Sequence, residues 1–124
     1  SESAAFAQQC EQAGLHFVGP SPATIERLGD KLAARELASE LGVPVLAGSR
    51  VPCRSADEVR SLMAAEGVDW PIMLKASGGG GGRGIRPVLV DVELDDAFSA
   101  CTREGSVAGV GGGVFFEQYV PAAR

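Results

Sequence analysis

The sequence has few of the residues that build metal centres or disulfide frameworks. Its only histidine is His16, and its three cysteines, Cys10, Cys53 and Cys101, stand far apart in the chain. An odd number of widely spaced cysteines fits neither a disulfide framework nor a zinc site. It indicates a reducing compartment, the cytoplasm or, in a eukaryote, the mitochondrial matrix. We expect the cysteines to be small packing residues and His16 to be structural.

Long apolar runs and an excess of positive charge are also absent. No run approaches the roughly 18 residues of a membrane-spanning helix, and no signal peptide is recognisable, so we expect no membrane association. The net charge is −5, which argues against nonspecific binding of nucleic acid. The length of 124 residues allows one ordinary domain or pieces of two, and 45% hydrophobic residues with 22% charged residues are typical of a folded soluble protein.

Glycine, by contrast, is plentiful, and the most informative stretch is the glycine-rich segment Lys75–Gly84, KASGGGGGRG. Glycines lack a Cβ, so the backbone can approach a ligand closely, and successive N–H groups can form a concavity for an anion. Lys75 precedes the glycines and Arg83 follows them, and both cations suit a phosphate. Flexible linkers are also glycine-rich, but apolar runs border this segment. The segment therefore predicts a phosphate-binding loop.

Three familiar glycine-rich phosphate loops do not fit. A Walker loop has its lysine after the glycines. A dinucleotide-binding fingerprint is matched formally by Gly79, Gly81 and Gly84, but a helix must follow it, whereas residues 85–90 are rich in β-branched residues and predict a strand. In protein kinases the lysine lies on a strand after the loop. Because residues 70–74 also read as a short buried strand, we expect a hairpin folded over phosphates.

The rest of the pattern predicts alternating helices and strands. Pro87 must lie on an edge strand or at a bulge, because proline cannot donate to a ladder. Ser55 and Glu58 form a capping box. The first expected helices are 4–13, a short helix opened by Ser21 and Pro22, and 31–41, capped by Asp30. Two more are expected, one between Ser55 and Gly67 and one that carries Leu94, Phe98 and Cys101. The other expected strands are 15–18 and 114–120, and a plain turn at 109–113 precedes the second of these.

Three ordered segments carry a resemblance to a known family. The glycine-rich segment with the following Ile-Arg resembles the lid hairpin of biotin carboxylases, which are ATP-grasp enzymes. Residues 17–25, FVGPSPATI, with residues 28–35, LGDKLAAR, are similar to the family's strand-to-helix passage. Residues 115–121, FFEQYVP, resemble its adenine-side hinge strand, and residues 1–14 look like the helix before the first segment. The resemblance thus covers nearly the whole chain.

The resemblance implies an α/β (α+β) fold in two parts. Residues 1–43 would be the C-terminal part of a Rossmann-like N-terminal domain. Residues 44–124 would be the ATP-grasp lid subdomain, an antiparallel sheet with helices on one face. Two positions depart from the family pattern: Pro87 stands where aliphatic residues are usual, and Gln118 where lysine is common.

The resemblance also assigns ATP-binding roles. Lys31 and Lys75 would hold phosphate oxygens, Glu117 would accept from the adenine amino group, and Gln118 and Val120 would offer main-chain contacts to the ring. The glycine-rich segment would cover the phosphates through Gly79, Gly80, Gly81, Gly82, Arg83 and Gly84. No catalytic or metal-binding residue is assigned within the chain.

The implied activity is ATP-dependent carboxylation of biotin by bicarbonate, as part of an acyl-CoA, pyruvate or related carboxylase. The implied cofactors are ATP, magnesium held by ligands beyond residue 124, and biotin on a carrier domain. The implied partners are the rest of the biotin carboxylase, the biotin carboxyl carrier and the carboxyltransferase. We expect the chain to be a segment of a longer protein and inactive alone. Another ATP-grasp ligase, such as a carbamoyl-phosphate synthase or a D-alanine ligase, and a noncatalytic nucleotide-binding module are the alternatives.

Overall fold

A computed structural model of the chain describes residues 2–77, 84–107 and 113–121. The chain divides into two compact units, Ser1–Pro44 and Val45–Arg124. Each unit is described by itself. In the described part of the chain, no helix is both long and apolar enough to span a membrane.

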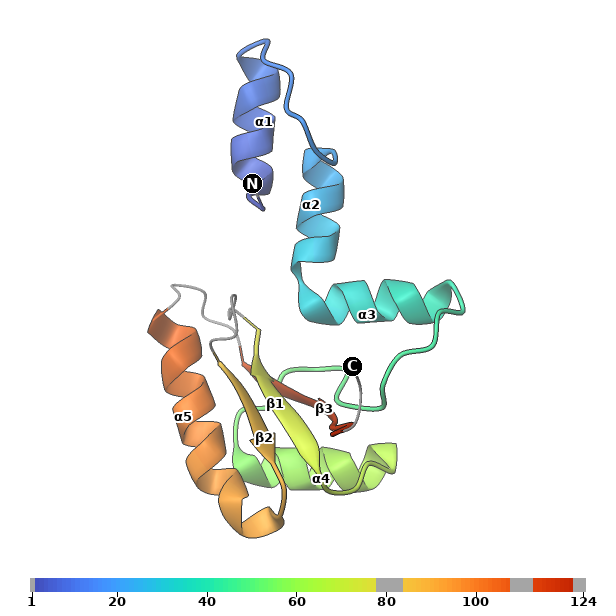
Figure 1. Ribbon diagram of the computed structural model, residues 1–124, viewed down its shortest axis with the longest axis vertical. Coiled ribbons are helices and arrows are strands. Elements are labelled where there is room, and N and C mark those ends of the chain that lie inside the picture. The colour runs from blue at the N-terminus through green and yellow to red at the C-terminus, as the bar shows by residue number, and fades with distance from the viewer. Residues whose placement is uncertain (1, 78–83, 108–112, 122–124) are drawn as a thin grey trace. The chain divides into compact units, whose positions relative to one another are not determined.

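The first unit consists of three helices in its described residues, α1 (Ala4–Gln12), α2 (Pro22–Gly29) and α3 (Lys31–Glu40) (Figure 1). Their N-termini are capped by side chains, as the sequence predicts. Ser21 Oγ accepts a hydrogen bond from Thr24 N at 3.3 Å. Asp30 Oδ1 accepts from Leu32 N at 2.8 Å and from Ala33 N at 3.1 Å. A cap of this kind satisfies backbone donors that the first helical turn leaves without partners.

The expected strand at 15–18 is wrong. These residues connect α1 to α2 without regular secondary structure, and Val18 is 91% exposed. A strand forms when a neighbouring strand takes up its backbone hydrogen bonds, and the described residues of this unit include no strand to pair with. The apolar residues alone were therefore insufficient to fix the conformation.

The second unit contains a three-stranded antiparallel sheet and two long helices. In chain order its elements are α4 (Ala56–Glu66), β1 (Ile72–Ala76), β2 (Ile85–Val88), the 3₁₀ turn η1 (Asp91–Glu93), α5 (Leu94–Val107) and β3 (Val114–Gln118). The strand order is β2-β1-β3, so β1 lies in the centre, as Figure 1 shows. The predicted strands on both sides of the glycine-rich segment are thus confirmed as an antiparallel pair.

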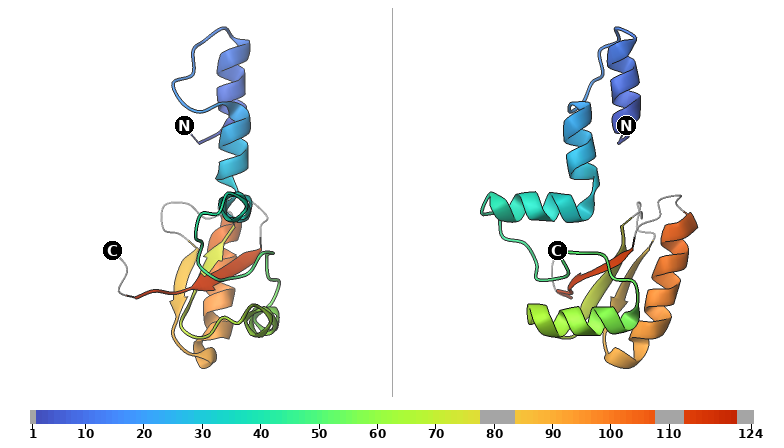
Figure 2. Two further views of the ribbon diagram at one scale, coloured as in Figure 1. Left: turned by 90° about the vertical axis from the view of Figure 1, so that its right-hand side faces the viewer. Right: turned by 180° about the vertical axis from the view of Figure 1, so that it is seen from behind.

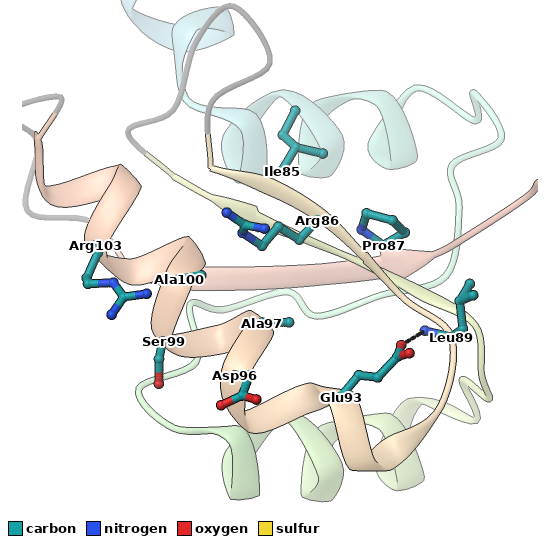
Figure 3. A pocket seen from close by; sticks show the side chains of 10 residues that line it. All are labelled: Ile85, Arg86, Pro87, Leu89, Glu93, Asp96, Ala97, Ser99, Ala100 and Arg103. Atoms are coloured by element: carbon teal, nitrogen blue, oxygen red, sulfur yellow. Dashed lines mark hydrogen bonds between the residues drawn. The ribbon is translucent and has the colours of Figure 1, made fainter.

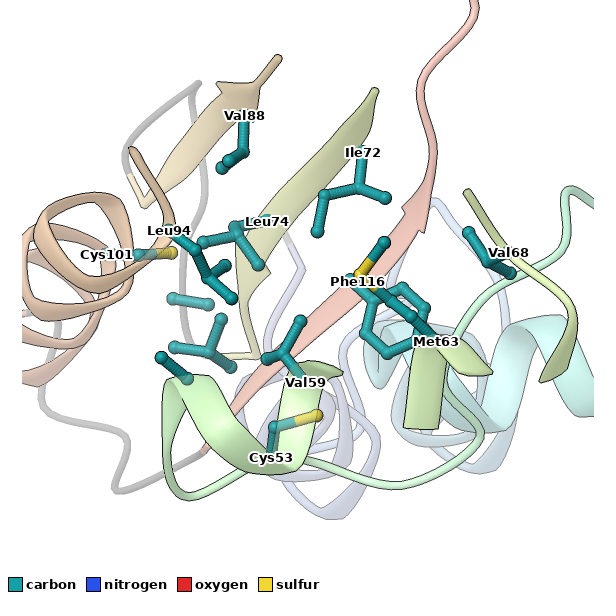
Figure 4. Close-up of a cluster of buried hydrophobic side chains, with 13 residues drawn as sticks. Cys53, Val59, Met63, Val68, Ile72, Leu74, Val88, Leu94, Cys101 and Phe116 are labelled. Atoms are coloured by element: carbon teal, nitrogen blue, oxygen red, sulfur yellow. The ribbon is translucent and has the colours of Figure 1, made fainter. Parts of the chain in front are cut away.

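Both helices of this unit, α4 and α5, cover the same face of the sheet (Figure 2). Along β1, Ile72, Leu74 and Ala76 are buried and alternate with the partly exposed Met73 and Lys75. The buried residues join a core with side chains from both helices and from the neighbouring strands, including Val59, Met63, Val88, Leu94, Cys101 and Phe116 (Figure 4). Full burial of a large aliphatic or aromatic side chain stabilises a fold by about 1.5–3 kcal/mol. This one-sided core supports the antiparallel sheet with helices on one face.

Two predicted local features are found with modifications. Pro87 lies on the edge strand β2 opposite Met73, so its missing N–H interrupts no central ladder. In the capping box, Ser55 Oγ accepts from Glu58 N at 3.2 Å, but Glu58 Oε2 accepts from Arg54 N at 2.7 Å. We expected Glu58 to accept from the backbone N–H of Ser55. Its flexible side chain accepts instead from the N–H of the preceding residue, Arg54.

The outer edge of β3 is lined by residues 47–49. Gln118 N donates to Ala47 O at 2.7 Å, and Ser49 N donates to Phe116 O at 2.9 Å. Gly48 bridges to Glu117, and a Cβ at this glycine would meet Phe116 O at 2.2 Å. Only a glycine permits this close approach. The contact holds β3 from the side opposite β1.

Candidate functional site

The sheet face opposite the helices carries the candidate site. Side chains alternate across a strand, so Lys75 of β1 points away from the face that holds Leu74 and Ala76. Register places Lys75 opposite Phe115, and Met73 opposite Glu117. Lys75 and Glu117 therefore lie on the same face as diagonal neighbours on adjacent strands, a separation that long side chains can bridge.

Lys75 and Glu117 form an ion pair. Lys75 Nζ donates to Glu117 Oε2, with 26% of the lysine side chain and 10% of the glutamate side chain exposed. A carboxylate with so little contact with water requires a charged or hydrogen-bonding partner, and Lys75 is such a partner. Two residues separated by 42 positions in the sequence are thus brought together by the β1–β3 pairing.

Gln118 is used inside the fold. Its side-chain Nε2 donates to Pro71 O at 2.9 Å and to Asp69 O at 3.2 Å, and its backbone N–H donates to Ala47 O. The amide side chain therefore joins the end of β3 to the turn before β1. A lysine at this position could not reproduce both the length and the geometry of the planar amide, although its ammonium could also donate to carbonyls.

The backbone N–H of Val120, unlike that of Gln118, has no hydrogen-bond acceptor among the described residues. The side chain of Val120 is 45% exposed. The preceding N–H, that of Tyr119, donates to Pro71 O at 3.0 Å. A backbone donor at position 120 is consequently available to a ligand.

Gly84 is held tightly at the start of β2. Its φ is +69°, in the left-handed region that favours glycine, and a Cβ would meet the Cβ of Ala76 at 2.8 Å. The Gly84 carbonyl accepts from Ala76 N at 2.7 Å and from Cys101 Sγ at 3.0 Å. Its N–H donates to Glu104 Oε2 at 2.9 Å. The N–H of Gly84, a residue predicted to bind ATP, is thus used by an internal hydrogen bond.

Glu104 also binds Arg86. Arg86 Nη2 donates to Glu104 Oε1. One carboxylate on α5 therefore contacts both Arg86 in β2 and Gly84 just before that strand. The hydrogen bond from Gly84 N–H, and next the contact with Arg86, lower the pKa of the Glu104 carboxyl below its ordinary value. Sequence reasoning missed this residue because no motif contains it. The one available signal was its position three residues after the core residue Cys101, which places both on one helical face.

The remaining predicted site residues lie in the first unit or outside the described residues. Lys31 is the first residue of α3 in the first unit, partly buried and preceded by the cap Asp30. Gly79, Gly80, Gly81, Gly82 and Arg83 lie outside the described residues, as does the turn expected at 109–113.

An open groove of about 730 Å³ lies between β2 and α5 (Figure 3). Arg86 and Pro87 line it from the strand, Ala97 and Arg103 from the helix. The described residues that line it include none of those predicted to bind ATP. In the described part of the chain, no group of three histidine, cysteine, aspartate or glutamate side chains could hold a metal ion.

Residues 30–124 match the family described as "Carbamoyl-phosphate synthase L chain, ATP binding domain". The chain belongs to this family. It is 46% identical to a pyruvate carboxylase of Aspergillus niger over 120 residues, which are 97% of this chain and 10% of that protein. It is 43% identical to a biotin carboxylase of Halalkalibacterium halodurans over 124 residues, which are 100% of this chain and 27% of that protein. The resemblance to biotin carboxylases is therefore confirmed, and the chain spans about a tenth to a quarter of these relatives.

Solved structures of biotin carboxylases agree with this assignment. The biotin carboxylase domain of Hydrogenobacter thermophilus 2-oxoglutarate carboxylase, in complex with MgADP, ADP and bicarbonate, matches with a TM-score of 0.87 and 34% identity, over 97% of this chain and 26% of that one. A Campylobacter jejuni biotin carboxylase–βγ-ATP complex matches with a TM-score of 0.88 and 32% identity over the same shares. A D-alanine-D-alanine ligase of Helicobacter pylori, at 19% identity and a TM-score of 0.75, shares the fold alone.

Proposed function

We propose that this chain supplies the ATP-binding segment of a biotin carboxylase, which carboxylates biotin with ATP and bicarbonate within a pyruvate, acyl-CoA or related carboxylase. The observation that carries the proposal is the placement of Lys75 and Glu117 together on the sheet face opposite α4 and α5. Family membership and the likeness to a biotin carboxylase domain in complex with MgADP and bicarbonate support it. Within this proposal, residues 1–43 end a Rossmann-like domain and residues 44–124 form the lid subdomain.

Lys75 is the residue that we assign to a nucleotide phosphate. An ammonium has three donors, so Lys75 can keep Glu117 as a partner while it donates to phosphate oxygens. Its partial burial strengthens the interaction with an anion, because the screening by water is weaker there. We also assign Lys31 to phosphate oxygens. It lies in the first turn of α3, where a cation has no favourable interaction with the helix dipole.

Glu117 and the end of β3 are assigned to the adenine. A carboxylate accepts several donors at once, so Glu117 can receive the adenine amino group in addition to Lys75. The available N–H of Val120 supplies a backbone donor two residues further along the same segment. Gln118 then acts chiefly by holding this segment against the turn at residues 69–71.

The chemistry follows from binding and orientation. ATP supplies the phosphoryl group that activates bicarbonate, and magnesium neutralises charge on the phosphates. On this sheet face Lys75 is the cation that we assign to the phosphate oxygens. We assign magnesium ligands, bicarbonate contacts and biotin contacts to other parts of the protein, together with the biotin carrier and carboxyltransferase as partners.

The proposal is tested with the full-length protein that contains this chain. Bicarbonate-dependent ATP cleavage should require biotin, and Lys75→Ala should reduce kcat/KM for ATP by about ten- to a hundredfold, the loss of one or more charge-assisted hydrogen bonds. Arg50→Met is the matched control, because Arg50 loses the same charge from the same unit but is 84% exposed in its pair with Glu66. ATP cleavage that ignores biotin and depends on another acceptor would favour a different ATP-grasp ligase.

A further inference from the structure

Strand β2, which pairs with the strand of Lys75, contributes little buried surface to fix its register. Hairpin register is normally fixed by the turn and by the pattern of buried side chains. Of the four residues of β2, only Val88 is buried. The pattern of buried side chains on β2 is therefore a weak determinant of register, and other contacts must supply it.

A slip of register would change the residues of β2 that lie beside Lys75. Lys75 is paired with Ile85, and the next residue, Ala76, donates its N–H to Gly84 O. Successive side chains of a strand point to opposite faces, so a shift by one residue would exchange the faces of β2 relative to β1. The pairing of Lys75 with Ile85 would then be lost, even with β1 still anchored in the core.

We propose that Glu104 is a positioning residue that fixes this register and so places Lys75 for nucleotide binding. Its carboxylate contacts the backbone N–H of Gly84 and the guanidinium of Arg86, which flank Ile85, the partner of Lys75. The proposal rests on the nucleotide-binding role of Lys75 given above.

Helix α5 is a suitable anchor for such a contact. Leu94 and Cys101 of this helix are fully buried in the core, and Cys101 Sγ donates to Gly84 O. At the next turn, a Cβ on Gly105 would meet the Cβ of Ala76 at 2.7 Å, so the helix approaches β1 closely. Glu104 thus projects from a helix that is itself fixed against both strands. The lowered pKa of its carboxyl keeps it charged and able to accept both donors.

The test uses Glu104→Gln in the full-length protein, with and without Lys75→Ala. Glutamine retains the size of the side chain but loses the charge and one acceptor oxygen. We expect Glu104→Gln to raise the Kd for ATP roughly tenfold when Lys75 is present, the usual scale for a lost charge-assisted hydrogen bond. In the Lys75→Ala background the same change should raise it less than about twofold, because residues that act through one another are not additive. A general loss of stability would produce equal effects in both backgrounds.

Asp95→Asn is the matched control. Asp95 lies on the same helix and accepts from Arg60 at 2.7 Å, as Glu104 accepts from Arg86, but its partner lies on α4 and not on β2. The Asp95→Asn variant should bind ATP with the same affinity as the wild type. If Glu104→Gln fails to fold, Arg86→Met removes one of the two contacts and should show the same dependence on Lys75. Unchanged ATP affinity in the folded variant, or equal losses in both backgrounds, would overturn the proposal. An unaffected Lys75→Ala would instead overturn the nucleotide role itself.

Discussion

Gly48 lies so close to Phe116 that a Cβ at position 48 would stand 2.2 Å from the Phe116 carbonyl oxygen and 2.8 Å from the Cα of Glu117. Both contacts are with backbone, which cannot move aside as a flexible side chain can. The candidate glutamate is thus fixed on β3 by a glycine 69 positions earlier in the chain, beside the hydrogen bonds of Ala47 and Ser49 to the same strand.

Gly48→Ala should therefore destabilise the protein. We expect the free energy of unfolding to fall by about 1–3 kcal/mol, as for other insertions into a packed site. Gly29→Ala is the control, because Gly29 ends helix α2 with open space at its Cβ position and should be neutral or slightly stabilising. Thermal unfolding of the full-length variants measures both effects. An unchanged melting temperature for Gly48→Ala would contradict the close contact.

Glu117→Gln should reveal the difference between a shielded and an exposed ion pair. Lys75 would retain a neutral hydrogen-bonding partner but lose the opposite charge, and we expect a loss of about 1–3 kcal/mol. Glu66→Gln breaks the exposed pair with Arg50, whose atoms are 3.7 Å apart, and should change stability by less than about 0.5 kcal/mol. Equal effects of the two substitutions in chemical denaturation would argue against the shielding of the Lys75–Glu117 pair.

The stability contributed by Glu104 should depend on pH. Its pKa is lowered in the folded state, first by the hydrogen bond from Gly84 and then by Arg86. The stabilisation is therefore fully present above the ordinary glutamate pKa of 4.5 and disappears as the pH falls from that value through the lowered one. Thermal unfolding recorded across this range should show a shallower acid-induced decline for Glu104→Gln than for the wild type. If the wild type and Glu104→Gln showed the same dependence of stability on pH, the Glu104 carboxylate would not be the group that stabilises the fold.

The two core cysteines should be unreactive in the folded protein. Burial is the main cause that raises the pKa of the Cys53 thiol, and likewise that of Cys101, to about 11. Few thiolates are then present near neutral pH, and both side chains are almost fully covered. Iodoacetamide at about pH 8 should label Cys53 and Cys101 only after denaturation, as peptide mass mapping would detect. Rapid labelling of either cysteine in the native protein would be the opposite result.

Local signals in the sequence predicted most of the secondary structure. Asp30, Ser21 and Ser55 cap the helices that they were expected to open, because a cap depends only on residues within one turn. Pro87 identified an edge strand, since its chemistry excludes it from a central one. The strand expected at 15–18 failed for the complementary reason: a strand depends on a partner, which a local pattern cannot supply.

The candidate site was only partly predictable. Lys75 and Glu117 were each singled out by the resemblance, but their ion pair depends on the register of β1 with β3. The internal uses of the Gly84 N–H and of the Gln118 amide group were also invisible, because their partners Glu104 and Pro71 come from distant parts of the chain. Contacts of this kind follow from tertiary structure and leave no motif.

The most direct test of the central claim is an equilibrium titration of the full-length protein with MgATP. The account predicts that Lys75→Ala raises the Kd for ATP by about ten- to a hundredfold, corresponding to about 1.5–3 kcal/mol. Lys75→Arg should restore only part of the affinity, because a planar guanidinium does not reproduce the geometry of an ammonium. Arg50→Met should bind as the wild type does. An ATP affinity that is the same for the wild type and Lys75→Ala would contradict the assignment of this sheet face to the nucleotide.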